Sequence, residues 1–259
     1  MAVHRLGGAD RQLPGALAER AAGLVEGLHA SAMVGVGQFC TNPGLLIVKE
    51  AEGLDAFIAK VADLVSAAQP ATMLTPGIHQ AFESGVTKLE NNPNIKLAAQ
   101  AQATSGPNQC RARLFITTAD AFLNDHSLRD EVFGSSSLII RCKTDEEVLS
   151  LTNSLEGQLT ATVLMDQSDK TSFLKKLLSI LERKVGRILL NGYPTGVEVC
   201  HAMVHGGPFP ATSDSRTTSV GTEAIWRFLR PVAYQDVPTD LLPKVLRDGA
   251  EIPKQVNGG

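Results

Sequence analysis

One cysteine stands in a short polar loop between two apolar segments, where it could act as a nucleophile. The loop runs from Gly37 to Gly44 with the sequence Gly-Gln-Phe-Cys-Thr-Asn-Pro-Gly, and Cys40 is its reactive candidate. A cysteine attacks carbonyl carbon as the thiolate, which backbone N–H groups or a nearby cation stabilise. A lone cysteine is more often a small buried hydrophobic residue. The glycines at both ends permit close approach of other backbone, which favours the nucleophilic interpretation here.

The loop joins two elements that the apolar pattern predicts. Apolar residues recur at helical spacing from Pro14 to about His29, and the apolar run 45–49 is typical of a buried strand. Further strands are predicted at 113–117, 137–142, 159–164 and 187–190, and further helices at 54–68, 76–90, 144–155 and 168–183, the last ending before Gly186. Strands alternating with helices predict an α/β fold with a mainly parallel sheet covered on both faces.

Composition narrows the class of protein. The chain has 259 residues, 43% of them hydrophobic, and a net charge of −3, so it can bury a sizeable core. The sequence contains no basic stripe with interleaved aromatic residues, so it does not predict nucleic-acid binding. No apolar run approaches the ~20 residues of a membrane span. The N-terminus does not resemble a secretory signal, so we expect a cytoplasmic protein. No two of the four cysteines form a C-x-x-C pair, so the sequence predicts no zinc site and no disulfide framework.

The two ends differ from the middle. Residues 1–12 show no apolar period, and we expect a poorly ordered remnant or an artificial junction; the main domain, which contains Cys40, is expected over 13–225. Residues 226–238 are predicted to contain an edge strand, which Pro231 suits, and 239–259 a polar tail. The stretch 191–216 is rich in Gly, Pro, Ser and Thr, and ordered connections of this length tend to be functional.

Several separated motifs together resemble the aldehyde dehydrogenase superfamily. The loop around Cys40 is similar to its G-Q-x-C-T nucleophile loop, and residues 131–134 are similar to its E-x-F-G-P element, departing at Ser135. Residues 153–161 resemble its N-x-x-x-x-G-L-x-A segment. Residues 191–197, 205–212 and 219–222 look most like the 2-oxoglutarate semialdehyde (2,5-dioxovalerate) dehydrogenases. The resemblance covers about residues 13–238.

The resemblance implies an acyl-transfer redox reaction. Cys40 would attack the aldehyde, a hydride would pass to NAD or NADP, and the thioester would be hydrolysed to 2-oxoglutarate. Glu131 would hydrogen-bond the ribose hydroxyls of the nicotinamide cofactor, and Phe133 would contact the nicotinamide. Without the resemblance, Glu131 is interpreted as a solvated carboxylate and Phe133 as a core residue.

The resemblance also implies how substrate and partners would bind. Phe39 and Thr41 would line the aldehyde tunnel, and the loop from Pro194 to Gly196 would form its far wall. The partner would be a small-molecule aldehyde, and the C-terminal strand would pair chains into a homo-oligomer.

Departures from the family pattern predict a fragment. The family's chain is nearly twice as long, and its N-terminal half carries the Rossmann domain that binds the cofactor; no G-x-G-x-x-G turn occurs in this sequence. Arg5 stands where the family's general-base glutamate is expected. We therefore expect a three-layer α/β/α aldehyde-dehydrogenase-like catalytic domain that lacks the Rossmann cofactor domain and does not oxidise aldehyde by itself.

Two alternatives remain open at this level. The chain could be a non-catalytic oligomerisation module, or a cysteine hydrolase in which His201 or His205 serves Cys40 as base. The preference for NAD or NADP and the group that binds the substrate's far carboxylate also remain open, although Arg216 is available for the latter.

Overall fold

The computed structural model describes residues 8–12, 14–169 and 171–250, and only the backbone of those before Ala22. The chain divides into two compact units, one ending at Ala224 and the other beginning at Ile225. The candidate site lies in the first unit. Each unit is described by itself.

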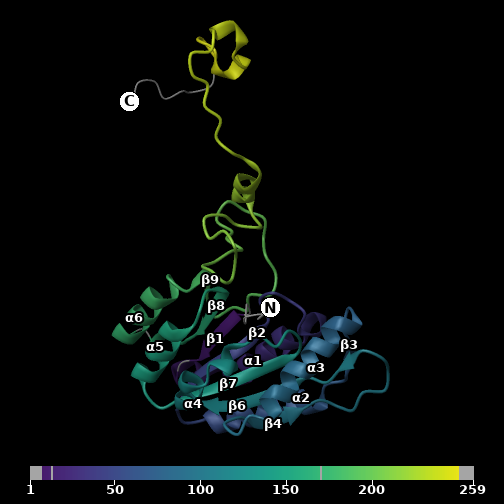
Figure 1. The fold of residues 1–259 in the computed structure, drawn as a ribbon. Helices are drawn as coiled ribbons and strands as arrows, with labels where there is room; N and C mark the ends of the chain where they lie inside the picture. Colours follow the sequence, from purple (N-terminus) through teal and green to yellow (C-terminus); the bar gives the residue numbers. More distant parts are fainter. Residues whose placement is uncertain (1–7, 13, 170, 251–259) are drawn as a thin grey trace. The chain divides into compact units, whose positions relative to one another are not determined.

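A seven-stranded sheet forms the centre of the first unit (Figure 1). Its strand order is β4-β6-β7-β2-β1-β8-β9, and every neighbouring pair is parallel except β4 and β6. The strands are β1 (Gly8–Gln12), β2 (Pro43–Lys49), β4 (Lys96–Gln100), β6 (Arg113–Thr118), β7 (Ser136–Cys142), β8 (Gln158–Leu164) and β9 (Val185–Leu190). Strands β3 (Ala71–Thr72) and β5 (Gln109–Cys110) form a small antiparallel pair. The predicted mainly parallel sheet is confirmed.

Helices cover both faces of this sheet. Helices α1 (Pro14–Met33) and α2 (Leu54–Ala67) lie on one face, and α3 (Pro76–Glu90), α4 (Ala119–Asn124), α5 (Asp145–Ser154) and α6 (Ser172–Leu181) lie on the other. Alternate side chains of a strand point to opposite faces. Accordingly, Leu46 and Val48 of β2 pack with α1 and α2, while Leu45 and Ile47 pack with the other helices. The three-layer α/β/α arrangement is therefore confirmed.

The N-terminal region differs from the prediction. Residues 8–12 form β1, which pairs in parallel with both β2 and β8, so the expectation of poor order was wrong for these residues. The sequence Gly-Ala-Asp-Arg-Gln carries no apolar period, and hydrogen bonding to a strand on each side supplies the order instead. Residues 1–7, including Arg5, lie outside the described residues.

The strand predicted within 226–238, all of which the structure describes, does not form. The 3₁₀ segment η4 (Thr222–Phe228) is followed by irregular chain and by two short 3₁₀ turns, η5 (Thr239–Leu241) and η6 (Lys244–Leu246). A strand needs a hydrogen-bonding neighbour, and no described residue provides one to this segment. Residues 251–259 of the predicted tail lie outside the described residues.

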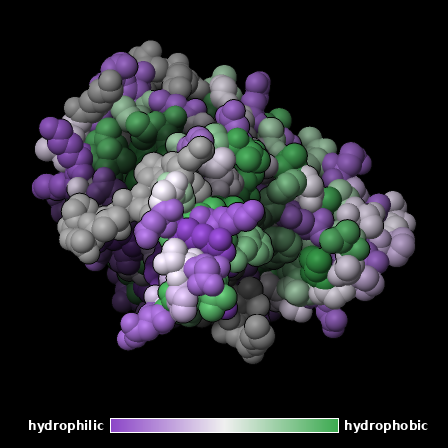
Figure 2. Space-filling view, turned by 90° about the horizontal axis from the view of Figure 1, so that it is seen from above, coloured by the Kyte–Doolittle hydropathy of each residue, from purple (hydrophilic) through white to green (hydrophobic). Residues whose placement is uncertain are grey.

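Large apolar side chains are exposed in the second unit. Trp226 is 60% exposed and Phe228 85% exposed. In the space-filling view, groups of hydrophobic residues lie among hydrophilic ones at the surface (Figure 2). Apolar exposure of this kind is typical of surfaces that bind a partner.

Two further boundaries were misjudged. Helix α6 begins at Ser172 after an N-cap at Thr171, because residues 167–169 form the separate 3₁₀ turn η3 (Gln167–Asp169). The helix ends at Leu181, so Gly186 is a residue of β9 rather than a helix stop.

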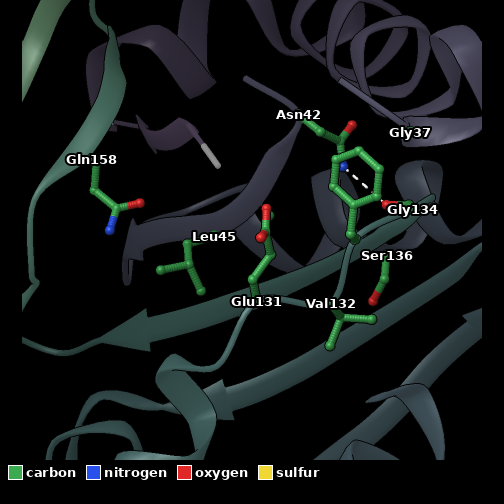
Figure 3. Close-up of a pocket in the computed structure, with 10 residues that line it drawn as sticks. Gly37, Asn42, Leu45, Glu131, Val132, Gly134, Ser136 and Gln158 are labelled. Atoms are coloured by element: carbon green, nitrogen blue, oxygen red, sulfur yellow. Dashed lines mark hydrogen bonds between the residues drawn. The ribbon is translucent and has the colours of Figure 1, made fainter. Parts of the chain in front are cut away.

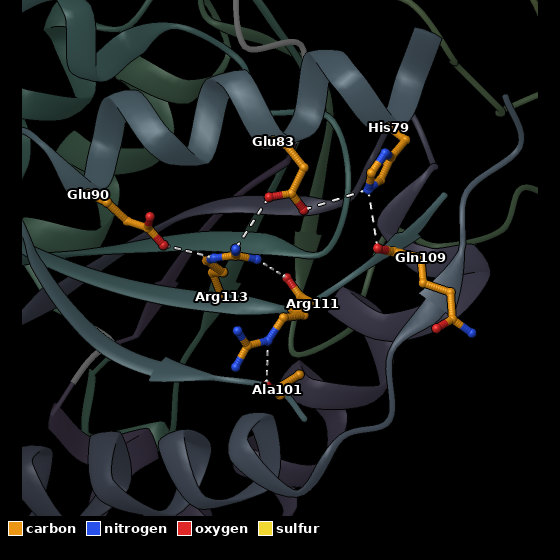
Figure 4. A network of polar contacts seen from close by, with 7 residues as sticks. All are labelled: His79, Glu83, Glu90, Ala101, Gln109, Arg111 and Arg113. Atoms are coloured by element: carbon orange, nitrogen blue, oxygen red, sulfur yellow. Dashed lines mark hydrogen bonds and ion pairs between the residues drawn. The ribbon is translucent and has the colours of Figure 1, made fainter. Parts of the chain in front are cut away.

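A buried arginine ties α3 to the sheet (Figure 4). The Arg113 side chain, on β6, is 7% exposed; its Nε donates to Glu90 at 2.9 Å, and its Nη2 lies 3.4 Å from Glu83. Its Nη1 donates to the carbonyl oxygen of Arg111 at 2.7 Å. The guanidinium therefore satisfies two helix carboxylates and one backbone carbonyl at once.

Replacing Arg113 with methionine is expected to lower the free energy of unfolding by about 2 kcal/mol. Methionine keeps most of the buried volume but removes hydrogen bonds to charged partners, and the two glutamates remain partly hydrated, which limits the loss. Urea unfolding measures the change. The exposed Arg216→Met variant is the matched control, and an equal effect of both substitutions would contradict the role given to Arg113.

Candidate active site

The Cys40 loop begins with a backbone turn that only certain residues tolerate. The 3₁₀ segment η1 (Val34–Gly37) follows α1, and Gly35, Val36 and Gly37 have φ values of 57°, 61° and 64°. A β-carbon on Gly37 would overlap the backbone of Gly134 and Ser135. The loop bearing the cysteine is therefore in direct backbone contact with the loop that follows Glu131.

Side chains on both sides of Cys40 hold the loop in place. Thr41 is buried, and its hydroxyl donates to the carbonyl oxygen of Pro194 at 3.4 Å. Asn42 donates through Nδ2 to the carbonyl oxygen of Gly134 at 3.1 Å, and Gln38 accepts from the N–H of Leu74 at 2.9 Å. Three separate chain segments thus fix the position of the thiol.

The thiol itself is exposed and lies among three ionisable groups. His205 Nε2 is 3.2 Å from Cys40 Sγ. Partial burial raises the pKa of Cys40 above its ordinary value of 9.0, its own backbone N–H lowers the pKa, the charge of Glu131 raises it, and the charge of Arg187 lowers it. The net direction is upward, because partial burial is the largest of these contributions.

His205 is fixed by its backbone. Its N–H donates to Thr218 Oγ1 at 2.8 Å, and its carbonyl oxygen accepts from the N–H and the hydroxyl of Ser219. Burial, and then the charge of Arg187, lower the pKa of His205 below 6.5. The imidazole is therefore neutral at pH 7. His201 instead contacts the hydroxyl of Thr222 at 2.9 Å.

A pocket lies beside this loop (Figure 3). Glu131 and Phe133 line it together with Gly37 and Asn42, and the Glu131 carboxylate points into it. Asn42 Oδ1 is buried without a hydrogen-bond partner among the described residues. The pocket offers about 20 Å³, little more than one water molecule requires.

The side-chain types of Glu131 and Phe133 suit one end of a nicotinamide cofactor, because a carboxylate can accept hydrogen bonds from two sugar hydroxyls and an aromatic ring can pack against a planar pyridine ring. The pocket that they line has room for about one water molecule and not for a nicotinamide ring. The predicted contacts with the ribose and the nicotinamide therefore stay predictions.

The remaining predicted residues belong to the Cys40 loop or to the segment that contacts Thr41 and Arg187. Phe39 is 43% exposed, and Pro194 is buried against Thr41. Gly196 is exposed, and its carbonyl oxygen lies 3.4 Å from Arg187 Nη1. Thr41 is buried, and the predicted lining of an aldehyde tunnel stays a prediction.

Arg187 was not predicted from the sequence. It belongs to β9, in the run Val-Gly-Arg-Ile-Leu-Leu, and its Nη2 donates to the carbonyl oxygen of Pro194 at 2.8 Å. The available signal was a cation inside an apolar strand that leads directly into the long loop after Leu190.

The rate constant for alkylation of Cys40 by iodoacetamide is expected to rise about tenfold from pH 7 to pH 8. The raised pKa keeps the thiol mostly protonated there, and only the thiolate reacts. Rates are measured by mass mapping of the Cys40 peptide, because Cys200 is also partly accessible. A rate that levels off within this interval would show a lowered pKa instead.

Comparison with known proteins shows the family of this chain. Residues 15–210 match the aldehyde dehydrogenase family, and the chain belongs to that family. It is 48% identical over 235 residues to alpha-ketoglutaric semialdehyde dehydrogenase 2 of Azospirillum brasilense, covering 91% of this chain and 45% of the relative. It is 45% identical over 249 residues to alpha-ketoglutaric semialdehyde dehydrogenase of Acinetobacter baylyi, covering 95% of this chain and 47% of the relative. The chain spans less than half the length of these relatives.

Solved structures share the fold at low identity. Proline utilization A from Bdellovibrio bacteriovorus gives a TM-score of 0.70 at 20% identity, covering 87% of this chain and 23% of that protein. An aldehyde dehydrogenase from Bacillus cereus gives 0.69 at 16% identity, covering 86% and 43%. These similarities concern the fold alone.

Two kinds of feature are missing from the described residues. No described helix combines the length and apolar character needed to cross a bilayer. The described part of the chain also contains no group of three or more His, Cys, Asp or Glu side chains placed to hold a metal ion.

Proposed function

We propose that this chain carries the nucleophile of an NAD(P)-dependent aldehyde dehydrogenase that oxidises 2-oxoglutarate semialdehyde to 2-oxoglutarate. The observation that carries the proposal is the exposed Cys40 thiol beside a pocket lined by Glu131 and Phe133. Family membership and the names of the two relatives support the substrate class.

The chain's own residues would act on the aldehyde carbonyl. The Cys40 thiolate attacks the carbonyl carbon, a C–S bond forms, and the carbonyl oxygen becomes an oxyanion. The backbone N–H of Cys40 donates to that oxygen, a stabilisation worth about 3–4 kcal/mol for each donor in comparable sites. Phe39 and the loop from Pro194 to Gly196 would border the approach to the thiol. The cofactor, when bound, supplies the hydride acceptor.

Peptide mapping after reaction with a p-nitrophenyl ester tests the acyl-transfer part of this proposal. We expect a hydroxylamine-sensitive acyl group on Cys40, because a thioester is cleaved by that reagent. An acyl group confined to Cys200 or to a lysine would contradict the assignment. The expectation that the chain alone does not oxidise aldehyde stays a prediction, which reduced-nicotinamide absorbance tests.

A cysteine hydrolase remains the second candidate, because His205 Nε2 lies 3.2 Å from Cys40 Sγ. A neutral imidazole at that distance can accept the thiol proton. Loss of ester turnover on His205→Gln as well as on Cys40→Ala would favour the hydrolase, whereas loss on Cys40→Ala alone would favour the dehydrogenase chemistry. His201→Gln is the matched control.

The expected partners stay predictions. A homo-oligomer would form if the apolar side chains beyond Ile225 packed against a second copy, and sedimentation measures this. A monomer at all concentrations would count against the oligomerisation module. The expected absence of nucleic-acid and membrane partners and the cytoplasmic location likewise stay predictions.

A further inference from the structure

Arg187 carries a positive charge at the candidate site that no described carboxylate neutralises. Its Nη2 donates to the carbonyl oxygen of Pro194 at 2.8 Å, and its Nη1 lies 3.4 Å from both the carbonyl oxygen of Gly196 and Met203 Sδ. These acceptors are neutral, and no carboxylate of the described residues forms an ion pair with Arg187. Its Nε is buried and has no hydrogen-bond partner in the part of the chain that the structure describes.

A partly buried guanidinium without a counter-charge is costly to maintain. The buried arginine of the same sheet, Arg113, is paired with two glutamates, as buried charges normally are. Arg187 departs from that pattern. Bracing the loop from Pro194 to Gly196 accounts for its contacts with carbonyl oxygens but not for its uncompensated charge.

Arg187 lies next to the nucleophile loop, because its Nη2 and the hydroxyl of Thr41, the residue after Cys40, donate to the same carbonyl oxygen, that of Pro194. In agreement with this position, the charge of Arg187 lowers the pKa of Cys40, whereas the charge of Glu131 raises it. These residues come from different elements, β9 and the loop before β7. An anionic molecule approaching Cys40 is therefore attracted toward Arg187 and repelled from Glu131.

We propose that Arg187 receives the carboxylate of the aldehyde substrate and so orients the carbonyl carbon toward Cys40. This inference rests on the proposed function and assigns a residue of this chain to the carboxylate of its substrate. The 3.4 Å contact of Nη1 with the carbonyl oxygen of Gly196 is longer than a good N–H···O hydrogen bond, and the thioether sulfur of Met203 is a weak acceptor. A carboxylate can replace them with shorter, charge-assisted bonds.

The test compares two alkylating agents that differ in charge. The Cys40 alkylation rate is measured by peptide mass mapping with anionic iodoacetate and with neutral iodoacetamide, and their ratio removes effects on the thiolate population. Arg187→Met is expected to lower the iodoacetate-to-iodoacetamide ratio about tenfold, because the charge acts in a partly desolvated site. Arg187→Lys should retain most of the ratio, and Glu131→Gln should raise it.

Controls separate the site from general charge effects. Arg216→Met removes one exposed cation that pairs with Asp214, and it should leave the ratio unchanged. Arg187→Gln removes the charge but keeps a donor for the carbonyl oxygen of Pro194, so it should lower the ratio as Arg187→Met does, and it keeps the proposal testable if Arg187→Met does not fold. A ratio that responds to neither Arg187→Met nor Arg187→Gln, or equally to Arg216→Met, would overturn it. Alkylation needs no aldehyde oxidation, so failure of the proposed function would be recognised separately.

Discussion

Replacing Gly37 with alanine is expected to lower the free energy of unfolding by about 3 kcal/mol and to disturb the thiol. The residue has a φ of 64°, which costs an alanine about 1 kcal/mol. The new β-carbon would also overlap the backbone of Gly134 and Ser135, neither of which can rotate away. The Cys40 loop and the loop following Glu131 must then separate.

Urea unfolding measures the loss, and the Cys40 alkylation rate reports the displaced thiol. The matched control is Gly23→Ala in α1, where a β-carbon meets nothing within 4 Å. Alanine is there expected to stabilise by up to about 1 kcal/mol, because glycine weakens a helix interior. Similar stabilities of both variants would contradict the close packing of the two loops.

Cys40→Ala is expected to lower the rate constant of the p-nitrophenolate burst from a p-nitrophenyl ester at least about a thousandfold. Removing a nucleophile eliminates the covalent step and leaves only weaker binding and electrostatic contributions. Stopped-flow absorbance measures the burst. Cys200→Ala should leave it intact, because that thiol has no place in the proposed acyl transfer. A burst that survives Cys40→Ala would show that another group is acylated.

The apolar elements of the fold could be predicted because each carried its own periodic signal. Strand β7 is a run of buried residues, and α3 begins at the predicted residue, Pro76, after an N-cap at Thr75 whose side chain accepts from the N–H of Ile78. Strand β1 could not be predicted, because its order comes from backbone pairing with β2 and β8. Strand β4 was missed because its half-exposed edge position leaves little apolar pattern.

The candidate site divides in the same way. Cys40, Glu131 and Phe133 were found from local motifs, and the structure brings the first within reach of the charge of the second. The short distance between His205 and Cys40 depends on how the long loop after β9 folds. The sequence therefore left His201 and His205 as equal candidates for the base that serves Cys40. Arg187 carried no motif, since a cation in a strand is usually a solvated surface residue.

The most direct test asks whether an aldehyde reacts with Cys40. Iodoacetamide alkylation of the Cys40 peptide is followed by mass mapping with increasing 2-oxoglutarate semialdehyde, and 2-oxoglutarate, which has no aldehyde, serves as the matched control. The account predicts saturable protection by the semialdehyde and much weaker protection by 2-oxoglutarate, because only the aldehyde forms a C–S bond. No protection, or equal protection by both compounds, would contradict it.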